Sequence, residues 1–192
     1  MSAPVELIAL HCVRCNTPVP AAPDQVAWRC ATCGQGLQLD EQAGLRPLAV
    51  HFARADREGG VRWRPFWVAG GTVGFHVRQT YGRSRGPDEL WQGQRTFVLP
   101  AFACTLEQAG AWGASFLRQP LPVAEGPAVP FDPVTVDPAS ARALAEFVVL
   151  TIEAERRDHL KQVEFTLELQ EPVLWALPFP AGDGGLQPAL VR

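Results

Sequence analysis

Four cysteines near the start of the chain have a spacing that suits metal binding. They form two Cys-x-x-Cys pairs, Cys12/Cys15 and Cys30/Cys33, with fourteen residues between the pairs. Two such pairs are the ligand pattern of a tetrahedral four-thiolate site, which most often holds zinc. Four sulfur ligands leave no coordination position for a substrate. The spacing therefore predicts a closed, structural Zn²⁺ site.

The residues around each pair favour the same interpretation. Gly34 follows the second pair and Asn16 follows the first. Gly and Asn are the residues that best tolerate the positive φ angle that a metal-binding turn needs at this position. Short apolar segments flank the turns and are predicted to form strands, at residues 5–10, 25–29 and 37–39.

With these pairs and strands, residues 5–40 resemble the zinc-ribbon family, a small β module that holds one metal ion between two turns. The resemblance implies that the ion contributes folding free energy to the module. Such ribbons occur in transcription factors, ribosomal proteins, enzyme appendages and many bacterial proteins, so the resemblance does not imply a single function. The rest of the chain resembles no family that we can name.

Two other uses of four cysteines compete with a zinc site. Two disulfides would need an oxidising compartment, and no secretory segment precedes the pairs in this sequence. A rubredoxin-like iron site has the same ligand set. We favour zinc over iron because nothing else in the chain suggests electron transfer.

Length and composition are those of a globular protein with room for more than the ribbon. The 192 residues allow one further domain. The N-terminus lacks a signal segment, and the longest apolar run, residues 147–152, is too short to cross a bilayer. We therefore expect a soluble, cytoplasmic protein without a membrane span.

The predicted fold class is α+β, in which the zinc ribbon precedes a mainly antiparallel sheet with two helices. Gly70-Gly71 predicts a two-residue hairpin turn. The Thr105–Gln108 capping box and the Asp137-Pro138 pair each predict the start of a helix. The predicted divisions are a zinc ribbon at 1–44, a join at 45–60, an α+β domain at 61–180 and a loose tail at 181–192.

Arginines are concentrated between residues 51 and 95. In the predicted hairpin, Arg62, Arg64 and Arg78 share the polar face, where we expect ion pairs with Glu164 and Glu168 of a neighbouring strand. The loop at 82–93 carries Arg83, Arg85 and Trp91, which we interpret as exposed, partner-binding residues.

Three functions are consistent with these observations. The first is a non-enzymatic adaptor that binds a protein partner or self-associates. The second is a nucleic-acid-binding protein that uses the ribbon and the Arg-rich segment 51–95. The third is an enzyme with a site between the sheet and residues 120–138. Separately, Cys104 could be a nucleophile with His76 or His159 as its base, but a free cysteine is usually buried and nothing nearby would lower its pKa, so we assign no catalytic residue.

Overall fold

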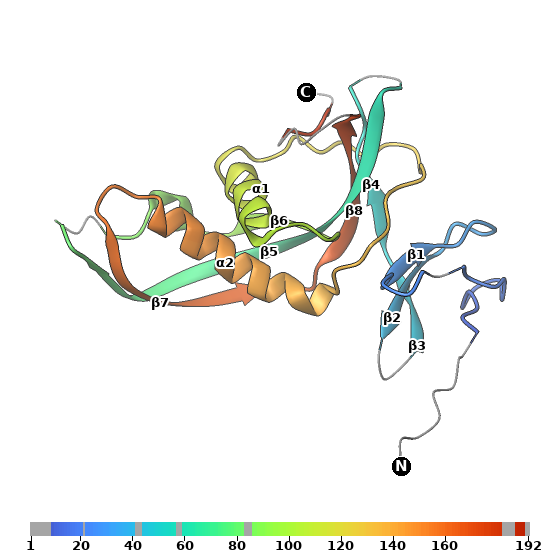
Figure 1. Cartoon of the computed structure of the whole chain (residues 1–192), viewed down its shortest axis with the longest axis horizontal. Helices are drawn as coiled ribbons and strands as arrows, with labels where there is room; N and C mark the ends of the chain where they lie inside the picture. The colour runs from blue at the N-terminus through green and yellow to red at the C-terminus, as the bar shows by residue number, and fades with distance from the viewer. Residues whose placement is uncertain are drawn as a thin grey trace, which may run out of the picture.

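The computed structural model describes residues 9–20, 22–40, 44–56, 59–82, 86–181 and 187–190. It confirms the α+β class, with mainly antiparallel sheets and two helices (Figure 1). The strands are β1 Ala27–Arg29, β2 Gly36–Asp40, β3 Gly44–Leu48, β4 Val50–Phe52, β5 Val61–Thr80, β6 Arg95–Pro100, β7 Leu160–Leu169 and β8 Val173–Pro180. The helices are α1 Leu106–Arg118 and α2 Ala141–Ala154, with 3-10 turns η1 Glu89–Trp91 and η2 Pro138–Ser140.

The first three strands form a small antiparallel sheet beside the cysteine pairs. Its order is β1-β2-β3, and β2 pairs with β3 from Gly36 to Asp40. We call the described residues 9–48 the N-terminal module. The segment 45–60, interpreted from the sequence as a join, supplies most of β3 to this sheet and β4 to the next one.

The large sheet is built around β5, which is twenty residues long. Strands β7 and β8 follow one another along one edge of β5, pairing with residues 71–80 and 61–68 respectively. Strand β6 pairs with residues 66–71 on the opposite edge, and β4 lies parallel to β8. The N-terminal module therefore lies at one end of the molecule and the β5–β7 pair at the other (Figure 1).

The hairpin prediction was wrong, because Gly70 and Gly71 continue β5 without a turn. These glycines permit close packing instead. A Cβ atom at Gly70 would lie 2.4 Å from Oε1 of Gln170, and one at Gly71 would lie 2.9 Å from the carbonyl oxygen of Glu168. The Gly70-Gly71 pair, which in the sequence resembled a tight turn, instead allows neighbouring segments to approach β5 closely.

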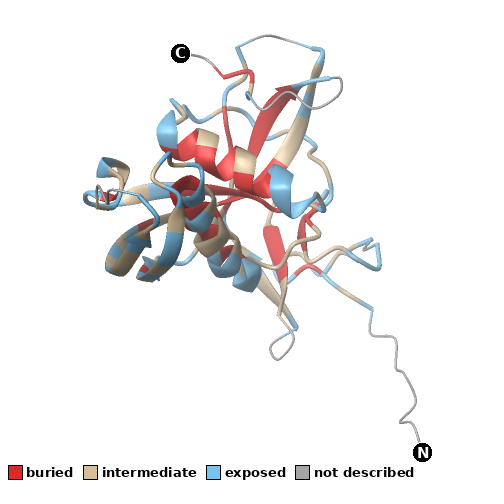
Figure 2. Ribbon diagram, turned by 60° about the vertical axis from the view of Figure 1, so that its left-hand side comes forward, coloured by how far each residue is buried: buried red, intermediate tan, exposed pale blue. Residues whose placement is uncertain are grey.

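Apolar clusters cover both faces of β5 at its centre. Phe66 and Trp67 are fully buried, and consecutive strand residues point to opposite faces. Trp67 packs in a cluster with α2 side chains such as Val148. Phe66 packs with aromatic side chains of α1, and α1 contributes residues to both clusters. Figure 2 shows the buried residues gathered where the helices meet the sheet.

Both helix starts agree with the sequence. The Thr105 hydroxyl accepts a hydrogen bond from the Gln108 amide, and the Gln108 side chain accepts one from the Thr105 amide, so the predicted capping box is confirmed. Asp137 caps the 3-10 turn that leads into α2. No helix in the described ranges is long and apolar enough to span a membrane.

The tail predicted at 181–192 is described only in part. Residues 182–186, 191 and 192 lie outside the described part of the chain. Ala189 and Leu190 are buried, and Ala189 accepts a hydrogen bond from the Asp56 amide at 3.0 Å and donates one to the Pro178 carbonyl at 2.7 Å. This segment therefore packs on the large sheet.

Candidate metal centre

The two Cys-x-x-Cys pairs form the turns that the sequence predicts. The Asn16 amide donates to the Cys12 carbonyl at 2.8 Å, and the Gly34 amide donates to the Cys30 carbonyl at 2.9 Å. Asn16 has a φ of 58° and Gly34 a φ of 75°. Both turns therefore use the left-handed conformation that Gly and Asn tolerate best.

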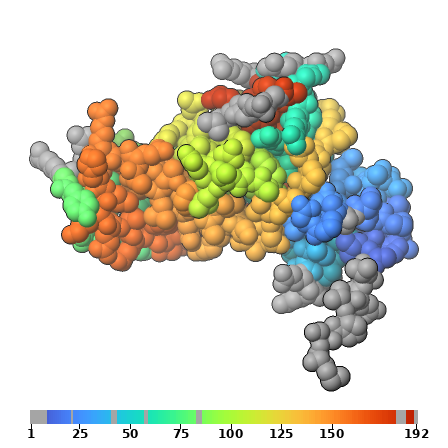
Figure 3. Space-filling model, in the orientation of Figure 1, coloured from blue at the N-terminus to red at the C-terminus, as the bar shows by residue number. Residues whose placement is uncertain are grey.

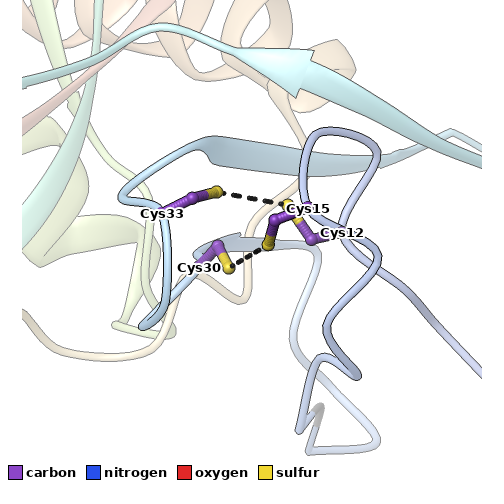
Figure 4. A group of neighbouring side chains, drawn as sticks. All are labelled: Cys12, Cys15, Cys30 and Cys33. Carbon is purple, nitrogen blue, oxygen red and sulfur yellow. Dashed lines mark hydrogen bonds between the residues drawn. The ribbon is translucent and has the colours of Figure 1, made fainter.

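These turns bring the four sulfur atoms together (Figure 4). All four Sγ atoms lie within 4.8 Å of one another, and Cys12–Cys33 and Cys15–Cys30 are each 3.6 Å apart. A tetrahedral ion with metal–sulfur distances of about 2.3 Å places its ligands about 3.8 Å apart. The four sulfurs thus have the spacing of ligands around one ion, and the donor set fits a structural metal.

Hydrogen bonds favour the thiolate form at two of these cysteines. The hydroxyl and amide of Thr17 lower the pKa of Cys15 to about 6. The amides of Cys33 and Thr32 lower the pKa of Cys30. At Cys33, the Gln35 amide acts in the same direction, but burial and the three neighbouring sulfurs outweigh it and raise the pKa to about 11. A cation among the sulfurs would remove this repulsion between thiolates.

The N-terminal module has little apolar core beyond the cysteines. Buried Cys12 and Cys30 pack with Trp28 and Leu37 in one small cluster. The Trp28 indole donates to the Gln25 side chain at 2.9 Å, which holds the loop between the two pairs. A cluster of this size does not stabilise a module without a metal or a neighbouring domain.

The module also packs on the large sheet. The Val26 amide donates to the Val134 carbonyl at 2.9 Å, and Ala27 is buried in the cluster that contains Trp67. The Arg29 guanidinium lies 5.8 Å from the centre of the Phe52 ring. Figure 3 shows the blue module seated against the yellow-orange segment that contains Val134. The metal centre therefore lies in a module that is fixed to the rest of the molecule.

The arginines of β5 do not form the predicted pairs with Glu164 and Glu168. Arg62 pairs with Asp132 at 2.6 Å, and Arg64 lies among aromatic rings. Arg78 is buried and pairs with Glu153 at 2.6 Å and with Asp158 at 2.7 Å. These partners come from segments far along the chain, so alternation along β5 could not identify them.

A β-bulge explains the different position of Arg78. Phe75 pairs with Phe165, but Val77 pairs with Glu164, so His76 is an extra residue in the ladder. Such a residue reverses the faces of those that follow. Arg78 consequently joins the face covered by α2. There, the hydrogen bond to Asp158 raises the pKa of Arg78, and Arg78 lowers the pKa of Asp158 to about 2.

The same network corrects one further prediction. Trp91 is 6% exposed, and its indole donates to Glu153 at 2.8 Å, so it is not an exposed partner-binding residue. Glu153 is fully buried and also accepts from the Asp88 amide. Arg83 and Arg85 lie outside the described residues, so their role as partner-binding residues stays a prediction.

The structure does not assemble the catalytic pair considered from the sequence. Cys104 lines a groove with Arg64, and neither His76 nor His159 is among its lining residues. Burial raises the pKa of the Cys104 thiol, partly offset by Arg64. His76 lies on the exposed face of β5, where it hydrogen-bonds Thr166 at 2.7 Å.

Comparisons of this chain with protein-family models, with curated proteins and with solved structures found no match. The site is therefore interpreted from its own geometry.

Proposed function

We propose that this protein is a non-enzymatic adaptor whose N-terminal module is a zinc ribbon with a structural Zn²⁺ ion. The four sulfurs within 4.8 Å of one another carry the proposal. Four thiolates complete a tetrahedral sphere, so the ion holds the module in shape and has no open position for catalysis. Zinc fits better than iron because nothing beside the sulfurs suggests electron transfer. Reduced thiols agree with a cytoplasmic location.

The ribbon offers a contact surface that the metal would hold in place. Val13 lies between Cys12 and Cys15 and is 50% exposed. His11 and Arg14 beside it are also exposed. An apolar side chain on a turn that the metal makes rigid loses little entropy on binding, which suits it for a protein partner.

Self-association has a separate candidate surface. The pairing of β5 with β6 ends at Gly71, so on that edge residues 72–80 of β5 have no strand partner among the described residues. An unpaired edge can accept a strand from another chain. A second copy of this protein is one such partner.

The metal is tested by its stoichiometry. We expect one zinc ion per chain by elemental analysis of purified protein, and loss of that zinc in Cys12→Ser. Cys104→Ser is the matched control, because Cys104 is a free cysteine outside the cluster. Wild-type protein without stoichiometric metal, or with its four sulfurs oxidised to disulfides, would contradict the zinc ribbon.

The adaptor role is tested by binding. Quantitative affinity enrichment with wild type and Val13→Glu as baits should show a partner that the variant loses while its zinc content stays unchanged. Native mass spectrometry of the same samples reports self-association. A wild-type sample that is monomeric and enriches no partner would count against an adaptor.

The arginine contacts do not favour the nucleic-acid alternative. Arg62 and Arg78 are engaged in ion pairs, and Arg95 donates to the carbonyl oxygens of Leu90 and Gln92. Arg78 is buried and therefore unavailable to a phosphate backbone, and Arg62 and Arg95 would have to exchange the oxygen partners that they already have. A gel-shift assay at low salt, where electrostatic binding is strongest, should show no retardation; salt-sensitive binding would restore this function.

A further inference from the structure

Arg64 occupies a groove that is separate from the metal centre. The groove has a volume of about 620 Å³, and its lining includes Arg64, Phe102 and Trp112. The guanidinium carbon lies 5.1 Å from the ring centre of Phe102, 5.6 Å from that of Trp112 and 5.8 Å from that of Phe179. These rings hold the cation and exclude part of its water.

The guanidinium of Arg64 lacks an acceptor. Across the described part of the chain, no carboxylate, carbonyl or side-chain oxygen takes a hydrogen bond from it. The lining does contain acids, but Asp132 is paired with Arg62 at 2.6 Å. A planar group of N–H donors is thus presented to the groove without a hydrogen-bonded partner.

A second donor in the same ring cluster also lacks a partner. Nε1 of Trp112 is the one buried side-chain nitrogen or oxygen, among the residues described, that makes no hydrogen bond. The Trp112 ring is one of the three around Arg64, but Nε1 itself is shielded from the groove. Trp112 therefore offers a ligand its ring and not a hydrogen-bond donor.

We propose that this groove binds a carboxylate that is attached to an apolar or aromatic body. The flat fork of an arginine matches the two oxygens of a carboxylate. The surrounding rings suit a planar or apolar body. A small carboxylic acid and the C-terminal carboxylate of a peptide both have this chemistry.

The charges of the lining argue for a single negative charge on the ligand. Asp24 and Asp132 lie in the groove with Arg62 and Arg64, so the lining has as many acidic as basic side chains. A polyanion such as a nucleic acid would be repelled by the two carboxylates. Asp24 comes from the N-terminal module, which therefore supplies part of the wall.

The test compares N-acetylphenylalanine with N-acetylphenylalanine amide, which has the same body without the charge. By isothermal titration calorimetry on the full chain, we expect the acid to bind at least about 10-fold more tightly than the amide. Arg64→Gln should remove this preference. Arg118→Gln makes the same charge change at an exposed residue outside the groove and should keep it.

A second comparison identifies the source of the carboxylate. A peptide that ends in phenylalanine is titrated with a free and with an amidated C-terminus. Tighter binding of the free peptide than of the single acid assigns the site to peptide termini, and equal binding assigns it to small acids.

Three results would overturn the proposal: equal binding of acid and amide, binding of neither at the highest soluble concentration, or undiminished acid binding by a folded Arg64→Gln variant. If that variant does not fold, Arg64→Lys decides, because it keeps the charge but not the fork and should reduce the preference for the acid. The zinc stoichiometry and the effect of Val13→Glu are measured separately, so the ribbon proposal can survive failure of this one.

Discussion

Glu153 shows how much one side chain determines at the far end of the molecule. Its carboxylate accepts from Arg78 at 2.6 Å, from the Trp91 indole at 2.8 Å and from the Asp88 amide at 3.1 Å. These donors come from β5 and from the loop that leads into η1. A fully satisfied buried carboxylate therefore fixes that loop onto α2.

Replacing Glu153 by Gln should lower the free energy of unfolding by about 3 kcal/mol, since breaking a buried ion pair leaves an uncompensated charge. Asp158 still pairs with Arg78, which keeps the loss of stability near the lower end of the range for broken buried ion pairs. Urea unfolding measures the free energy of unfolding of both proteins. Glu146→Gln removes an exposed pair with Arg142 and should change the free energy by less than about 1 kcal/mol. Equal effects of the two variants would contradict the role given to Glu153.

The ion pair of Asp158 should make stability depend on pH. Its folded pKa of about 2 is below the ordinary value of 3.8, so the carboxylate form is favoured in the folded protein. The stabilisation is complete above the ordinary pKa and is lost as the pH falls from 3.8 through about 2. Asp158→Asn should flatten the dependence of the unfolding free energy on pH in that range. Acid would release the metal from both proteins alike, so the difference between variant and wild type isolates the effect of Asp158. Identical curves of unfolding free energy against pH would refute the prediction.

At the scale of elements, the close contact between α1 and α2 depends on glycines, which have no side chain to separate the helices. A Cβ atom at Gly113 of α1 would lie 2.3 Å from Cγ2 of Val148 on α2. The helix start could be read from Thr105, but the reason for two glycines inside the helix appears only when α2 is in place.

Gly113→Ala should destabilise the protein by about 1–2 kcal/mol, because the overpacking cost exceeds the helix propensity gained. Gly74→Ala is the control, since a Cβ atom there meets nothing within 4 Å. It should change stability by less than about 0.5 kcal/mol. Thermal unfolding of both variants under saturating zinc measures the difference. A stabilised Gly113→Ala would show that the helices do not pack this closely.

The elements that the sequence predicted well are those set by local chemistry. Asn16, Gly34 and the Thr105 capping box act within a few residues, so spacing alone identifies them. The bulge at His76 is different, because it exists only in the pairing of β5 with β7. It reversed the face assigned to Arg78 and thereby concealed the Glu153 network. The rings around Arg64 were similarly hidden, since Phe102, Trp112 and Phe179 meet only in the folded protein.

At the scale of the whole molecule, the metal centre is coupled to the large sheet through one of its two apolar clusters. The Val26 amide donates to the Val134 carbonyl, and Ala27 lies in the cluster that contains Trp67. The cluster that contains Phe66 includes no residue of the module. The two parts should therefore respond differently when the metal is removed.

Chelation of the metal should release the N-terminal module while leaving β5, β7 and β8 folded. Hydrogen exchange followed by mass spectrometry should show lost protection across residues 9–48 and near Val134, because a ribbon derives its folding energy from the ion. Protection of the β5–β7 ladder should stay. Adding zinc back to the same sample is the control, and exchange that is unchanged by chelation would show that the metal does not hold the module.

The pairing of β5 with residues 160–180 also determines when the protein can fold during synthesis. The ribosome completes β5 at Thr80, but its partner strands begin at Leu160 and end at Pro180. The two cysteine pairs emerge together much earlier and can bind their ion first. While residues 81–159 are being synthesised, the longest strand of the protein therefore lacks the strands that pair along one whole edge, and contacts so distant in sequence form slowly.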